Sequence, residues 1–214
     1  MAKKRIYTVA TSHLDTIWSW DFETTVSKYI YNTLIENFAL LKKYPTYVFS
    51  FEGSYRYELM EEYYPELFEE LKKYIADGRW NVTGSAFENG DVNCPSPEAL
   101  FRNILIGNTY FDEKFGKRSC DIYLPDCFGF GWALPSIAHH AHLKGFTTQK
   151  LAWGSAYGVP FDIGKWYGVD GNYIYASLNP HSYYFTLTQI RDWDFVQDKL
   201  KENEKYGLDW TYIF

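Results

Sequence analysis

The chain has 214 residues, of which 46% are hydrophobic, and its formal net charge is −6 at pH 7. This length and apolar content allow one folded domain with a sizeable core. The basic residues form no block beyond Lys3, Lys4 and Arg5, so we expect neither a nucleic-acid partner nor binding to an anionic membrane. No apolar run is long enough to span a bilayer.

The cysteines and the aromatic residues narrow the class of protein further. Cys94, Cys120 and Cys127 are odd in number and widely spaced, which favours the reducing cytoplasm over a disulfide-stabilised secreted fold. Aromatic residues make up 21% of the chain. Because the C–H faces of sugars pack on aromatic rings, this composition adds weight to a carbohydrate ligand, although aromatic side chains more often fill ordinary cores and rims.

Strand-like and helix-like patterns alternate along most of the chain. The first strand is indicated by β-branched and aromatic residues near Ile6, and the first helix by an apolar stripe that runs from Val26 to Leu41. We predict strands at 6–9, 47–51, 80–85, 120–124, 146–153, 166–168, 172–178 and 208–214, and helices at 26–41, 55–63, 65–76, 96–115, 134–143 and 192–206. A tight turn at Val169-Asp170-Gly171 joins two of the strands.

The alternation predicts an α/β fold with a mostly parallel sheet and crossover helices, formed as one domain over residues 1–214. About seven strands allow either closure into a barrel or an open sheet. Catalytic groups of such folds gather at the C-terminal ends of the strands. His13, Asp15, Glu52, Asp91 and Asp126 all lie at or just past such ends.

His13 and Asp15 stand out because they are two residues apart at the end of the first strand. Residues i and i+2 of an extended segment point to the same face. An imidazole and a carboxylate on one face suit a divalent metal, and zinc accepts nitrogen and oxygen ligands. Glu52 could support a metal-bound histidine, or it could be a structural acid at a strand end.

A second stretch, Leu124-Pro125-Asp126-Cys127-Phe128-Gly129, again places a carboxylate just after a predicted strand. With both stretches, the chain resembles the N-terminal catalytic region of the retaining α-mannosidases of glycoside hydrolase family 38. Further matching pieces fall in the same order over essentially the whole chain. They include Gly78-Arg79-Trp80, Pro97-Glu98-Ala99-Leu100 and Gln149-Lys150.

The resemblance implies a seven-stranded (β/α) barrel and a zinc ion held by His13, Asp15, Asp126 and a histidine further downstream. Asp126 would also be the catalytic nucleophile that forms the glycosyl-enzyme intermediate. Trp18 and Phe128 would support the bound mannose, and Asp91 and Lys150 are further candidate substrate contacts. The expected substrates are α-mannosides or mannose-containing oligosaccharides.

The resemblance also has gaps. The chain contains no match for the general acid/base carboxyl group or for the fourth zinc ligand, so we expect a fragment of a larger enzyme that is inactive by itself. Such a fragment would associate with the remainder of the enzyme or with itself, because an uncovered final strand presents an edge for pairing.

Two alternatives remain open from the residues themselves. A metal-dependent carbohydrate deacetylase also uses an Asp/His metal site, but such enzymes usually supply two nearby metal-binding histidines, often spaced H-x-x-x-H, and this sequence has no such pair. A non-catalytic carbohydrate-binding module would use the aromatic residues alone. Release of acetate would indicate the first alternative, and sugar binding that is indifferent to chelator would indicate the second.

Overall fold

The computed structural model describes residues 4–152, 158–178 and 193–213. The ends of three predicted elements, at Trp153, Asp192 and Phe214, lie outside these ranges. The elements are β1 (Arg5–Thr8), β2 (Ala10–Ser12), α1 (Phe22–Thr24), the π-helix η1 (Thr25–Ile30), α2 (Tyr31–Lys43), β3 (Phe49–Glu52), α3 (Ser54–Tyr63), α4 (Pro65–Ala76), β4 (Trp80–Thr83), α5 (Pro97–Phe115), β5 (Asp121–Tyr123), α6 (Leu134–His140), β6 (Gly145–Thr147), the 3₁₀ helix η2 (Lys150–Ala152), β7 (Ile163–Tyr167), β8 (Tyr173–Ser177), α7 (Trp193–Glu204) and β9 (Trp210–Ile213).

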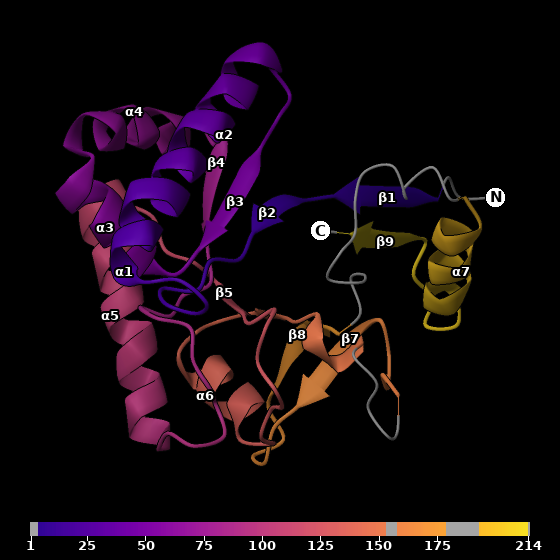
Figure 1. The fold of residues 1–214 in the computed structure, drawn as a ribbon. Helices are drawn as coiled ribbons and strands as arrows, with labels where there is room; N and C mark the ends of the chain where they lie inside the picture. The colour runs from indigo at the N-terminus through magenta and orange to yellow at the C-terminus, as the bar shows by residue number, and fades with distance from the viewer. Residues whose placement is uncertain (1–3, 153–157, 179–192, 214) are drawn as a thin grey trace. The chain divides into compact units, whose positions relative to one another are not determined.

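The chain divides into two compact units. The first, the helical unit, consists of Ala10–Asn89 and Glu98–Cys120. Its sheet has the order β2-β3-β4, and all three strands are parallel. Helices α2, α3, α4 and α5 gather around this sheet (Figure 1). Strands in parallel order joined by helices are what the sequence pattern predicts for this part of the chain.

One apolar cluster fills the helical unit. Its centre is Trp80 at the start of β4, which is fully buried and packs edge-on against Phe49 at 4.8 Å between ring centroids. The Trp80 indole N–H donates to the hydroxyl of Tyr57 at 2.9 Å, so its one polar atom is satisfied inside the core. The cluster joins the sheet to the helices through the buried residues Leu34, Phe38, Leu41, Phe51, Met60, Phe68, Leu71, Ile75 and Phe111.

Helix α5 approaches the segment after β4 unusually closely. A Cβ atom added at Gly107 would lie 2.2 Å from the carbonyl oxygen of Ser85 and 2.6 Å from the backbone nitrogen of Phe87. No larger residue fits there without displacement of backbone, so the glycine sets the spacing between the helix and this segment.

The second unit, the hairpin unit, combines Met1–Val9, Gly90–Pro97 and Asp121–Phe214. Its larger sheet has the order β5-β6-β8-β7, in which β7 and β8 form an antiparallel hairpin and the other pairs are parallel. A second sheet pairs β1 with β9 in parallel. Helix α7 packs on β9 through the buried side chains of Val196, Leu200 and Ile213.

A buried ion pair connects α7 to the strands of the hairpin unit. Lys199 of α7 donates to Asp162 at 2.7 Å, and both side chains are almost completely buried. Asp162 lies immediately before β7 and also accepts from the hydroxyl of Thr211 in β9 at 3.2 Å. Three elements therefore meet at one carboxylate.

The structure confirms a mixed α/β fold with mostly parallel strands, and it places the predicted turn at 169–171 between β7 and β8. Among the described residues, the strands form three separate sheets, and a seven-stranded barrel is not present in their pairing. The strand predicted at 146–153 is too long, because β6 ends at Thr147 and a 3₁₀ turn follows at Lys150. Within the described ranges, no helix is long and apolar enough to cross a membrane.

Candidate active-site residues

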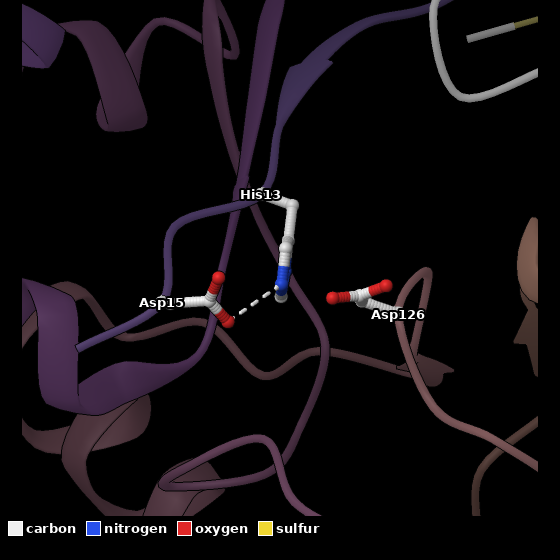
Figure 2. Close-up of side chains that lie close together, drawn as sticks. All are labelled: His13, Asp15 and Asp126. Atoms are coloured by element: carbon white, nitrogen blue, oxygen red, sulfur yellow. Dashed lines mark hydrogen bonds and ion pairs between the residues drawn. The ribbon is translucent and has the colours of Figure 1, made fainter. Parts of the chain in front are cut away.

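His13 lies one residue past the end of β2 and is flanked by two carboxylates of the helical unit. Its Nδ1 is hydrogen-bonded to Oε1 of Glu52, and its Nε2 lies 3.2 Å from Oδ1 of Asp15; the contact with Asp15 is the dashed line in Figure 2. The predicted pairing of His13 with Asp15 on one face is therefore present. The strand register explains the Glu52 contact, because Ser12 pairs with Phe51 and the next residues of both strands are neighbours.

The two carboxylates control the protonation of this imidazole. Burial by itself lowers the pKa of His13, but the hydrogen bonds and negative charges of Asp15 and Glu52 outweigh it and raise the pKa from 6.5 to about 10. Without a metal ion, His13 is therefore a cation near neutral pH that donates from both ring nitrogens. Glu52 is fully buried, and its Oε2 atom has no hydrogen-bond partner among the described residues.

Asp126, the acid of the second stretch, lies in the hairpin unit just after β5; its carboxylate is labelled in Figure 2. It forms an ion pair with Lys150, whose ammonium group is largely buried. The same ammonium nitrogen lies 4.9 Å from the ring centroid of Phe128, whose side chain is 82% exposed. Three residues predicted for the site thus form one group within this unit: a carboxylate, a cation and an aromatic ring.

The other two predicted residues lie on loops. Trp18 of the helical unit is 74% exposed and contacts Trp20 edge-on at 5.6 Å between centroids. Asp91 of the hairpin unit accepts hydrogen bonds from the backbone N–H of Asn93 at 2.6 Å and from the thiol of Cys94 at 3.7 Å. The local turn therefore already uses both carboxylate oxygens of Asp91.

Sequence reasoning missed two side chains that contact the turn carrying His13 and Asp15. Arg56 of α3 is buried and donates to the carbonyl oxygen of Leu14, and Glu88 accepts from the hydroxyl of Thr16. A helical arginine ordinarily indicates an exposed position, and no pattern in the sequence marks either residue as a neighbour of the turn.

The comparisons with known proteins decide the family. The model for the N-terminal domain of glycosyl hydrolases family 38 matches residues 3–208. The chain belongs to glycosyl hydrolase family 38. The resemblance inferred from the two short stretches is therefore confirmed over nearly the whole chain.

Relatives within family 38 carry names that refer to mannose. The chain is 30% identical to alpha-mannosidase G of Dictyostelium discoideum over 191 residues, which cover 89% of this chain and 18% of that protein. It is 28% identical to an alpha-mannosidase of Saccharomyces cerevisiae, with coverage of 94% and 19%. The chain thus spans about a fifth of the length of these curated relatives.

Solved structures agree on the fold. An alpha-mannosidase from Enterococcus faecalis V583 superposes with a TM-score of 0.79 at 24% identity, covering 99% of this chain and 24% of that one. A 4-alpha-glucanotransferase from Thermococcus litoralis also superposes, with a TM-score of 0.63 at 14% identity, and covers 97% of this chain and 32% of that one. At these identities, the likeness establishes the fold alone.

Proposed function

We propose that these residues belong to a zinc-dependent retaining α-mannosidase that releases terminal α-linked mannose, and that they form the N-terminal part of its (β/α)-barrel catalytic domain. The observation that carries the proposal is His13 between two carboxylates, in a chain that belongs to family 38. The names of the relatives support mannose-containing substrates.

The donor set fits zinc. By the resemblance to family 38, His13 Nε2 and the carboxylates of Asp15 and Asp126 would hold the ion, since zinc takes nitrogen and oxygen donors at about 2.0–2.2 Å. Neighbouring donors around a tetrahedral ion at such bond lengths lie about 3.4 Å apart, and 3.2 Å separates His13 Nε2 from Asp15 Oδ1. Glu52 on Nδ1 supports the proposal, because metal-binding histidines usually donate their other N–H to an oxygen acceptor.

Asp126 has the central chemical role. Its carboxylate attacks the anomeric carbon, the bond to the leaving oxygen breaks, and a glycosyl ester forms on the enzyme. A second carboxyl group, which we assign to no residue of these 214, gives its proton to the leaving oxygen and then takes one from the attacking water. When bound, zinc would orient the sugar hydroxyls and stabilise negative charge as a Lewis acid.

The remaining residues would bind the sugar. Phe128 and Trp18 expose aromatic faces suited to the C–H face of a hexose. Lys150, which is paired with Asp126, would also donate an N–H to a sugar hydroxyl. Each carboxylate oxygen of Asp91 accepts one hydrogen bond within its turn and has a second lone pair, with which it would accept from a sugar hydroxyl.

The metal site is tested by zinc content after gel filtration, compared between the wild type, His13→Ala and His139→Ala. His139 is an exposed histidine on α6, so its removal controls for non-specific imidazole binding. We expect one zinc per chain in the wild type and in His139→Ala, and none in His13→Ala. Equal zinc in all three proteins would contradict the assignment of His13.

The reaction is tested with an aryl α-mannoside and the whole protein that contains these residues. We expect mannose to be released with its α configuration retained, as seen in the first-formed anomer by ¹H NMR, and Asp126→Asn to abolish turnover. Inversion of configuration would contradict the role of Asp126 as a nucleophile. Acetate release from an acetylated sugar would favour the deacetylase instead.

A further inference from the structure

The turn that carries His13 and Asp15 is held by side chains from two other segments of the helical unit. Strand β2 ends at Ser12, so residues 13–16 lie beyond the strand. The carbonyl oxygen of Leu14, midway between His13 and Asp15, accepts two hydrogen bonds from Arg56. The distances are 3.0 Å from Nε and 2.6 Å from Nη2.

Glu88 extends this contact to the other side of Asp15. Its Oε1 pairs with Nη1 of Arg56, and its Oε2 accepts from the hydroxyl of Thr16 at 2.6 Å. Glu88 is itself fixed by Asn103 of α5, whose amide accepts from the Glu88 backbone N–H at 3.1 Å and donates to the Glu88 carbonyl at 2.8 Å. The residues on both sides of Asp15 are thus held by hydrogen bonds, Leu14 by Arg56 and Thr16 by Glu88.

The placement of Arg56 is energetically demanding. Its side chain is 3% exposed, and a guanidinium cannot lose its charge to relieve burial. The charge is compensated by Glu88, which is 35% exposed. The planar fork lets one side chain bind a carbonyl and a carboxylate together, whereas a lysine ammonium is a single point charge that cannot reproduce that geometry.

A second arginine provides a comparison. Arg79 also donates to backbone carbonyls, those of Tyr47 at 2.7 Å and of Leu41 at 2.9 Å. Those carbonyls belong to the end of α2 and the loop that follows it, where no candidate site residue lies. Arg56 differs because its acceptor separates two proposed ligands, so that a change in its position moves both donors.

We infer that Arg56 and Glu88 are positioning residues that hold His13 and Asp15 in the geometry that a metal ion requires. The inference rests on the proposed function and deepens it. Neither residue touches the metal; Arg56 fixes the backbone between the two ligands, and Glu88 fixes Arg56 and Thr16. Preorganised ligands bind a metal more tightly than the same ligands on a loose turn.

The test compares the zinc dissociation constants of Arg56→Lys, Thr16→Val and Arg79→Lys in the full chain, measured by competition with a chromophoric chelator. Thr16→Val removes only the hydroxyl that donates to Glu88, with little change in volume. Because supporting residues typically contribute 10–100-fold to metal affinity, we expect Arg56→Lys to weaken zinc binding at least about 10-fold. Thr16→Val should weaken it less, and Arg79→Lys should leave it unchanged.

Stability is measured separately by chemical denaturation of each metal-free variant, and affinities are compared where all variants are folded. A purely structural role for Arg56 predicts that Arg56→Lys and Arg79→Lys both lower the denaturation midpoint, with wild-type zinc affinity in each. That result would overturn the inference. The Co²⁺ absorption spectrum gives a second readout, which should change in Arg56→Lys and not in Arg79→Lys.

The His13→Ala variant distinguishes failure of the proposed metal site from failure of the positioning role of Arg56 and Glu88. If the wild type binds no more zinc than His13→Ala, the proposed metal site is wrong and the positioning role falls with it. If the wild type binds zinc through His13 and Arg56→Lys binds it equally well, only the positioning role is overturned.

Discussion

The helical unit and the hairpin unit fix their strand-end carboxylates by different physical means. In the helical unit, a large apolar cluster holds the sheet and helices together, and Glu52 stands at the end of a core strand. In the hairpin unit, the pairing of β1 with β9 and the hydrogen bond from Asn93 to the carbonyl of Gly129 join three separate chain segments. The buried contacts of Asp162 hold α7 and β9 to the start of β7 within one of these segments. Both units bury apolar side chains, and the hairpin unit adds an ion pair, Lys199 with Asp162, in which both partners are almost completely buried.

The difference shows in the neighbours of the candidate acids. Asp15 and Glu52 surround an imidazole whose charge depends on pH and on metal, whereas Asp126 is paired with the ammonium group of Lys150. The candidate acids of the helical unit therefore contact a titratable imidazole, whereas the candidate acid of the hairpin unit contacts an ammonium group.

The largest effect should come from the core of the helical unit. Trp80→Ala removes the fully buried indole and leaves the Tyr57 hydroxyl without its donor. We expect a loss of about 4 kcal/mol in the free energy of unfolding, measured by urea denaturation. Trp132→Ala, at an exposed position of the hairpin unit, is the matched control and should cost about 1 kcal/mol or less. Equal losses of unfolding free energy in Trp80→Ala and Trp132→Ala would contradict the central place of Trp80 in the core of the helical unit.

The hairpin unit should be most sensitive at its buried ion pair. Lys199→Met leaves Asp162 buried without its cation, which should cost about 3 kcal/mol in denaturation experiments. The double variant Lys199→Met with Asp162→Leu removes both charges and should recover part of this loss, because two apolar side chains need no compensation. A double variant less stable than Lys199→Met alone would contradict this explanation.

A smaller and more specific effect is expected at Glu52. Glu52→Gln keeps the shape of the side chain but removes a negative charge from His13, so the pKa of His13 in the metal-free chain should fall below about 10. NMR titration of the imidazole measures this value. Zinc affinity should fall about 10–100-fold, since the acceptor on Nδ1 becomes a neutral amide.

The same shift predicts a pH dependence of stability. The pKa of His13 in the folded, metal-free chain is raised above 6.5, so its contribution to stability is fully present below pH 6.5 and is lost as the pH rises to about 10. Glu52→Gln should reduce the stability lost across this window. Identical pH profiles of the free energy of unfolding for both proteins would show that Glu52 does not support the protonated imidazole.

The smallest effect should come from Asp170 in the β7–β8 turn. Hydrogen bonds from Ser136 and Asn172, with His140 adding a third, hold the pKa of this carboxyl group below its usual 3.8. Its contribution to stability is therefore present above pH 3.8 and is lost as the pH falls further. Asp170→Asn should flatten the acid side of the stability profile slightly, whereas the control Asp198→Asn, on the exposed face of α7, should not.

Much of this fold and part of the site could be predicted from the sequence. The His13–Asp15 pair follows from the two-residue period of an extended chain, and the turn before Asn172 follows from Asp170 and Gly171. The sequence offers the support of a histidine by Glu52 only as one of two alternatives, because the contact with His13 depends on the register between β2 and β3, which only the folded sheet defines.

Other features escaped prediction for related reasons. The segment from Phe146 to Trp153 contains β-branched and aromatic residues typical of a strand, yet β6 ends at Thr147, and local composition does not mark that end. The sequence does not indicate that Arg56 lies next to the site, because its acceptor is a backbone carbonyl 42 residues away in the chain. Every residue type has a backbone carbonyl, so the identity of residue 14 does not indicate a contact with Arg56.

The missing side chain at Gly107 has a consequence well beyond helix α5. The segment that presses on this glycine, Ser85 to Phe87, leads directly to Glu88. One methyl group at position 107 would push that segment away from the helix, and Glu88 would move with it. Gly107 lies on a helix that carries no proposed ligand. It therefore influences the position of Glu88, and through Glu88 the position of the turn around Asp15.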